Sequence, residues 1–198
     1  MATLVPTRLR TEGLDTPLAI DEAKPRLSWI VNSDDRDATQ GAWRITAAAT
    51  PEDLEGGTDL LWDSGRVEGD DTVHVEWDGA ALPSHQAVHW QVQSWDAEGV
   101  AGPVSDIAHF RMGLLTPRDW TGKYIGFKAP NVPEPVCARR AFQVDAGLVS
   151  ATLAITAQGV HEPWLNGRRV GEDFFQPGWT DYRRRRLYTV YDLSLIHI

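Results

Sequence analysis

The residues best suited to chemistry are concentrated in one stretch, residues 159–185. The stretch combines hydrogen-bonding groups with aromatic rings, and its candidate ligand contacts are Glu162, Asn166, Glu172, Asp173, Trp179, Asp181 and Tyr182. A side-chain amide offers donors and acceptors, carboxylates accept hydrogen bonds, and indole or phenol rings can stack on the apolar face of a ligand. This combination is typical of binding rather than of bond breaking.

Predicted reversals of the chain within this stretch indicate a long structured loop. Leu165-Asn166-Gly167-Arg168 predicts a tight hairpin turn, because Asn-Gly is the pair best able to take positive φ at both central positions. Gly171 and the Pro177-Gly178 pair predict two further reversals. Long structured loops on β-scaffolds are frequent binding sites.

Most of these candidates also have a purely structural explanation. Turn geometry alone explains Asn166, and packing of a long loop on its own sandwich explains Trp179 and Tyr182. Glu172 and Asp173 are equally consistent with solvated loop charges. Both explanations stay open at the level of the sequence.

Motifs for catalysis or for a cofactor are not found. The histidines are scattered without the spacing of paired metal ligands, and neither a Gly-rich phosphate loop nor a Gly-x-Ser-x-Gly elbow occurs. The sequence therefore predicts no catalytic residue, no resident cofactor and no metal site.

Charge argues against nucleic acid as a partner. The net charge is −9, and it divides into 8 Lys and Arg against 20 Asp and Glu in residues 1–113, and 11 against 8 in residues 114–198. Four adjacent arginines, residues 183–186, could neutralise phosphates, but in a strand they would point alternately to opposite faces. We expect these arginines to protect a strand edge instead.

Composition places the chain among ordinary globular proteins, with 42% hydrophobic and 24% charged residues. The single cysteine, Cys137, excludes an internal disulfide. No apolar run approaches the length of a membrane span or of a signal-peptide core, so the expectation is a cytoplasmic protein without a membrane partner.

Strand signals recur at short spacing with turn residues between them, and no window shows a convincing apolar repeat at helical spacing. The sequence therefore predicts an all-β fold, whose strands position the loop. The first expected module, residues 1–115, is a fibronectin type III-like β-sandwich, with strands at residues 26–31, 42–49, 60–66, 72–77, 88–96 and 108–112. Trp29, Trp43 and Trp90 are expected in its core. The second module, residues 116–198, has expected strands at residues 123–128, 137–144, 151–157, 162–165 and 186–191.

The ordered set of motifs resembles the amino-terminal region of bacterial α-L-rhamnosidases. The motifs are Pro25-Arg26-Leu27-Ser28-Trp29, Trp62-Asp63-Ser64-Gly65, Trp90-Gln91-Val92-Gln93-Ser94-Trp95-Asp96, Leu165-Asn166-Gly167-Arg168-Arg169-Val170-Gly171 and Pro177-Gly178-Trp179-Thr180-Asp181-Tyr182. The resemblance implies a fibronectin-like domain followed by a jelly-roll module, here incomplete. It also implies a parent enzyme that releases terminal α-L-rhamnose with inversion from glycosides or polysaccharides.

In that family the two catalytic carboxylates come from a helical domain further along the chain, so no catalytic residue is carried over and this chain is expected to be inactive alone. Its expected partners are a rhamnose-containing glycoside and the missing carboxyl-terminal domains of the same protein. Some similar rhamnose-binding modules use calcium, although no Asp-rich calcium loop is present here.

The end of the sequence departs from the family pattern, because residues 194–198 run apolar where a polar turn and further strands are expected. We interpret this as a truncation near Leu193. The alternative to a rhamnosidase fragment is a free-standing carbohydrate-binding or adhesion protein, which the DNA sequence downstream of residue 193 would distinguish.

Overall fold

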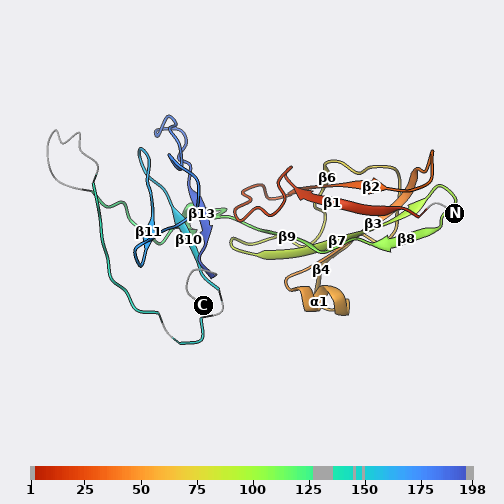
Figure 1. Cartoon of the computed structure of the whole chain (residues 1–198), viewed down its shortest axis with the longest axis horizontal. Coiled ribbons are helices and arrows are strands. Elements are labelled where there is room, and N and C mark those ends of the chain that lie inside the picture. The colour runs from red at the N-terminus through yellow and green to blue at the C-terminus, as the bar shows by residue number, and fades with distance from the viewer. Residues whose placement is uncertain (1–2, 127–135, 145, 149, 195–198) are drawn as a thin grey trace. The chain divides into compact units, whose positions relative to one another are not determined.

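A computed structural model describes residues 3–126, 136–144, 146–148 and 150–194 (Figure 1). The chain divides into two compact units, Met1–Asp119 and Trp120–Ile198. Within the described residues no helix has the length and apolar character required to cross a membrane.

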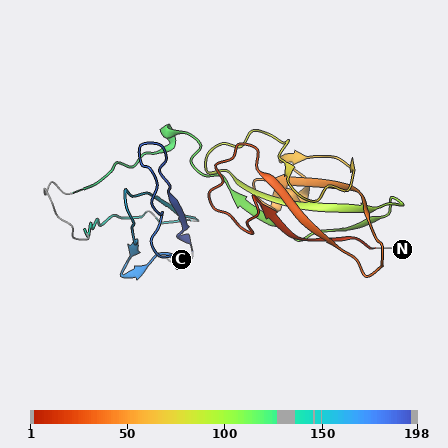
Figure 2. The same ribbon diagram turned by 90° about the horizontal axis from the view of Figure 1, so that it is seen from above.

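The first unit is a sandwich of two antiparallel sheets (Figures 1 and 2). One sheet has the order β1–β2–β6, and the other has the order β4–β3–β7–β8, with β5 beside β3 and β9 beside β7. The bounds are β1 Val5–Thr11, β2 Arg26–Asn32, β3 Gln40–Ala48, β4 Leu60–Asp63, β5 Val67–Glu68, β6 Val75–Glu76, β7 Ala87–Asp96, β8 Ala101–Val104 and β9 Ala108–Arg111.

The core lies between these sheets and is rich in indoles. Strict alternation along β7 buries Val88, Trp90 and Val92 completely, while the residues between them face outward. Trp29 and Trp43 are also buried, as predicted, and their rings meet edge to face with centroids 5.8 Å apart. Such contacts supply much of the apolar burial that holds the sheets together.

A buried polar network crosses this core. The Gln40 Oε1 atom accepts hydrogen bonds from Trp29 Nε1 at 3.2 Å and from Ser94 Oγ at 2.7 Å. Gln40 Nε2 donates to the backbone oxygen of Asp71 at 3.1 Å. These partners satisfy groups that would be costly to bury alone.

A short helix α1, which the search for apolar repeats at helical spacing did not predict, spans Pro51–Gly56. Thr50 caps its amino end, Pro51 supplies a preset φ, and Gly57 ends it at φ 64°. The helix is too short to show an apolar repeat, although its caps are visible in the sequence.

Two edge strands were also missed by the sequence analysis. Strand β1 contains Pro6 and several charges, and β8 contains Pro103, which are poor signals for a strand but are tolerated at a sheet edge. Pairing with β2 and β7 defines them, so they depend on tertiary contacts rather than on local pattern.

The segment after the sandwich stays attached to the first unit. Ser84 Oγ accepts from the Leu115 amide at 2.8 Å and donates to the Asp119 carboxylate at 2.6 Å. Asp119 also accepts from the Thr116 amide at 2.8 Å. The boundary between compact units in the structure falls between Asp119 and Trp120. The domain boundary expected between residues 115 and 116 stays a prediction.

The second unit has two antiparallel strand pairs among its described residues. Strand β10, Thr152–Ile155, pairs with β13, Thr189–Asp192, and β11, Trp164–Leu165, pairs with β12, Arg168–Arg169. The all-β prediction is confirmed for the fold class, apart from the short helix α1 and a 3₁₀ turn at Pro117–Asp119.

Several local expectations for this unit are wrong. Residues 123–126 and 137–144 are not strands, because no neighbouring strand pairs with them in the described part of the unit; residues 127 and 128 lie outside it. The arginine run is not a strand either. The amides of Arg184 and Arg185 donate to the Asp181 backbone oxygen, at 2.8 and 2.9 Å, and close a turn. The apolar residues 195–198 also lie outside the described residues.

Candidate ligand-binding site

The β11–β12 hairpin forms the centre of the candidate site. Asn166 and Gly167 have φ values of 50° and 78°, which confirms the predicted turn. The register pairs Trp164 with Arg169, so both side chains lie on the same face of the hairpin. The sequence of the turn thus decides which side chains face the following loop.

Arg169 organises this loop, and the sequence analysis did not identify it. Its Nε lies 3.5 Å from Glu162 Oε2, and its terminal nitrogen donates to the backbone oxygens of Glu172, at 3.0 Å, and Asp173. Its guanidinium carbon lies 3.9 Å from the centre of the Phe174 ring. A planar guanidinium can make all these contacts at once, which a lysine could not.

Three of the predicted candidates therefore gather around one cation. The Glu162 carboxylate bridges Arg169 and the Trp164 indole, whose Nε1 donates to Glu162 Oε1 at 2.8 Å. Glu172 and Asp173 contribute backbone oxygens to the cation, and their side chains are exposed. The register that follows from the predicted hairpin turn could have identified Arg169, because it places Arg169 across from Trp164.

The remaining candidates are Asn166, Trp179, Asp181 and Tyr182. Asn166 is at the exposed tip of the hairpin, and Trp179 is 80% exposed, which leaves its indole accessible for stacking. Asp181 pairs with Arg183 at 3.3 Å, and Tyr182 is half-buried. The assignment of these residues to a ligand site stays a prediction.

A contact between His161 and Tyr191 anchors the hairpin on β13. Their rings pack edge to face at 6.4 Å, and burial lowers the pKa of His161 and raises that of Tyr191. The His161 amide donates to the Gln176 oxygen at 2.7 Å, which ties the start of the segment to its later loop. Gly171 passes so close to Tyr191 that a Cβ would overlap the ring.

The described residues do not fit a calcium site. No three His, Cys, Asp or Glu side chains among them lie close enough to hold a metal ion together. The backbone oxygens of Glu172 and Asp173, which could be calcium ligands, instead face the positive charge of Arg169. We therefore derive no role for calcium.

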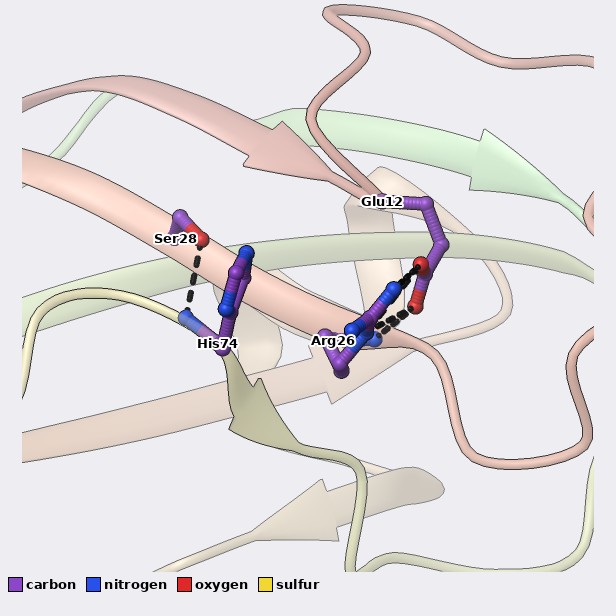
Figure 3. Close-up of polar contacts among 4 residues, drawn as sticks. All are labelled: Glu12, Arg26, Ser28 and His74. Carbon is purple, nitrogen blue, oxygen red and sulfur yellow. Dashed lines mark hydrogen bonds and ion pairs between the residues drawn. The ribbon is translucent and has the colours of Figure 1, made fainter.

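A second cluster, on the first unit, contains the residue types of a hydrolytic triad: Ser28, His74 and Glu12 (Figure 3). The bond between Ser28 and His74 runs from the His74 backbone amide to Ser28 Oγ at 3.0 Å, so it does not involve the imidazole. Glu12 accepts from Arg26 through both carboxylate oxygens, and this bonding lowers the Glu12 pKa. The cluster pins a turn and lacks the nucleophile–base contact that catalysis requires.

Comparison with known proteins connects both units to one family. The model of the Rha78A-like, N-terminal immunoglobulin domain matches residues 6–116, and that of the α-L-rhamnosidase N-terminal domain matches residues 146–196. α-L-Rhamnosidases of Alteromonas sp. (strain LOR) and Formosa agariphila are 34% and 32% identical over 96% and 93% of this chain. The matches cover 22% and 21% of those proteins, so the chain spans about a fifth of their length.

Solved structures agree with this assignment. The α-L-rhamnosidase of Dictyoglumus thermophilum matches 96% of this chain and 23% of its own, with a TM-score of 0.88 and 28% identity. The Streptomyces avermitilis enzyme, crystallised in complex with L-rhamnose, matches 99% of this chain and 21% of its own, with a TM-score of 0.61 and 30% identity. The chain therefore belongs to the α-L-rhamnosidases and corresponds to their amino-terminal domains.

Proposed function

We propose that this chain is the non-catalytic amino-terminal part of an enzyme that hydrolyses terminal α-L-rhamnose from glycosides, and that its second unit contacts the rhamnosyl substrate. The observation that carries the proposal is the likeness to the Streptomyces avermitilis enzyme, whose crystal structure contains L-rhamnose. The arrangement around Arg169 supports it, because a fixed cation and exposed aromatic rings are suited to polar and stacking contacts with a sugar.

In this proposal, the residues that catalyse hydrolysis lie outside this chain. Inverting glycosidases need a carboxylic acid to protonate the leaving oxygen and a second carboxylate to activate a water. Two of the carboxylates near the hairpin are already held in ion pairs: Glu162 by Arg169, with a further hydrogen bond from Trp164, and Asp181 by Arg183 of its own turn. We therefore expect this chain alone to release no p-nitrophenol from p-nitrophenyl α-L-rhamnoside, and measurable turnover would contradict the proposal.

Binding is tested by calorimetric titration with L-rhamnose, with D-glucose as the ligand control. We expect saturable heats with L-rhamnose only, and weaker binding after Trp179→Ala. Tyr124→Ala is the matched control, because Tyr124 is 57% exposed but lies outside the candidate loop. Equal heats for Trp179→Ala and the wild type would remove Trp179 from the site.

Asn166 allows a sharper experiment, because two substitutions separate its side chain from its backbone. Asn166→Gly removes the side chain but tolerates the positive φ of 50°, whereas Asn166→Ala removes the amide and also strains the turn. A direct sugar contact predicts that both variants bind weakly. Normal binding by Asn166→Gly would assign Asn166 to turn geometry alone.

A further inference from the structure

Two histidines face each other on the outer surface of the six-stranded sheet. His89 of β7 and His109 of β9 are directly opposite in the antiparallel register. Their ring centroids are 5.8 Å apart and their planes are inclined by only 30°. The alternation that buries Val88 and Trp90 sends His89 to the other face, so the pair lies outside the core.

The tautomer of His89 is fixed by a backbone contact. Its Nδ1 lies 3.1 Å from the carbonyl oxygen of Ala49. A carbonyl can only accept, so Nδ1 of the neutral ring carries the proton and Nε2 keeps a free lone pair. A histidine that donates one ring N–H to a carbonyl while its other nitrogen binds a metal is the common arrangement in metal sites.

The surroundings of His89 favour its neutral form, which is the form that binds metals. Burial lowers the pKa of His89, and the nearby charges of His109 and Arg111 act in the same direction. The Ala49 carbonyl and the Glu52 carboxylate act against this effect. The lowered pKa supports metal binding near neutral pH but does not by itself indicate a site.

Access to the pair is open from the side of His109. This exposed residue lines a cavity of about 250 Å³. Asp15, Asp106 and Arg8 are among the other residues that line this cavity. Because His109 is exposed, a hydrated cation can reach its ring from the solvent.

We propose that His89 and His109 together bind one divalent transition-metal ion, of the Zn²⁺ or Ni²⁺ type, on the outer face of the sheet. Imidazole nitrogen is a preferred ligand for these ions, and water would complete the coordination. No third His, Cys, Asp or Glu completes the group among the described residues, so the site is an exchangeable surface site rather than a structural zinc centre.

The experiment is a calorimetric titration of the full 198-residue chain with Zn²⁺ at about pH 7.5. We expect one equivalent to bind and the affinity to fall by about tenfold or more, which is about 1.4 kcal/mol, in His109→Asn and in His89→Asn. His74→Asn is the matched control, because His74 is an exposed histidine of the same unit that lies outside β7 and β9. Its affinity should equal that of the wild type.

Circular dichroism of each variant separates loss of the ligand from loss of the fold. His109 is exposed, so His109→Asn is expected to fold normally, and this variant decides the test even if His89→Asn is destabilised. Binding should also weaken on acidification, because protons compete with the metal ion for imidazole nitrogen. Failure of the wild type to bind Zn²⁺, unchanged affinity in His109→Asn, or equal loss in His74→Asn would overturn the proposal. None of these outcomes bears on rhamnose binding.

Discussion

Replacing the buried amide of Gln40 is the most direct perturbation of the first unit. Gln40→Met preserves the length of the side chain but removes every polar atom of the amide. The Trp29 indole and the Ser94 hydroxyl then lose their acceptor, and the Asp71 oxygen loses its donor. Trp29 is 2% exposed and Ser94 is fully buried, so water cannot replace the lost acceptor without opening the sandwich.

The expected magnitude follows from these exposures. Each buried donor left without a partner costs about 1–3 kcal/mol, whereas the oxygen of Asp71, an exposed residue, can bind water at little cost. The two buried donors together predict a loss of about 2–6 kcal/mol in the free energy of unfolding. That is a large share of the roughly 5–15 kcal/mol that stabilises a typical domain.

Urea unfolding followed by tryptophan fluorescence measures this loss, since most of the tryptophans lie in the first unit. The m-value should not change if only the stability of the native state is altered. Ser94→Ala provides an internal control, because it removes one of the two donors together with its need for an acceptor. The double variant Gln40→Met/Ser94→Ala should therefore be less destabilised than the sum of the single variants. A loss below about 1 kcal/mol for Gln40→Met, or strict additivity, would refute the reasoning.

Three other expectations follow from single contacts. Gly102→Ala should destabilise the first unit by about 1–3 kcal/mol, measured by urea unfolding, because its Cβ would overlap the Leu4 carbonyl; wild-type stability would contradict that close approach. Arg26 lowers the pKa of Glu12, so the Glu12 carboxylate stabilises the folded state above its unfolded-state pKa, and this stability is lost as the pH falls through its folded-state pKa. The difference in unfolding free energy between the wild type and Glu12→Gln should therefore shrink on acidification below about pH 5. A constant difference would exclude this linkage. Arg169→Ala should speed proteolysis of the candidate loop, and Arg169→Lys should be cleaved at a rate between those of the wild type and Arg169→Ala. A wild-type rate for Arg169→Lys would mean that positive charge alone holds the loop.

The alternation of apolar and polar residues was informative where one face of a strand is buried and the other is exposed to solvent. The alternation around Trp90 predicted β7 correctly, and the Asn166-Gly167 pair predicted the hairpin turn. The same approach failed for β1 and β8, whose prolines and charges are compatible with edge strands only once a neighbour pairs with them. It also failed for residues 137–144, where strand-like composition has no partner in the described residues.

The candidate site shows a similar limit. Residue types identified Glu162, Glu172 and Asp173, but not Arg169, which holds them together through one guanidinium. Likewise, the sequence separation of His89 and His109 shows no metal-binding spacing, because the sheet register alone places them opposite each other.

The sequence by itself determined the all-β class, the family and the hairpin turn of the candidate loop, because alternation, ordered motifs and Asn-Gly chemistry are local properties of the chain. The tertiary structure decided which side chains meet: Gln40 with Trp29 and Ser94, and His89 with His109. Such meetings depend on strand pairing between distant segments, where a shift of one residue would turn every side chain to the opposite face.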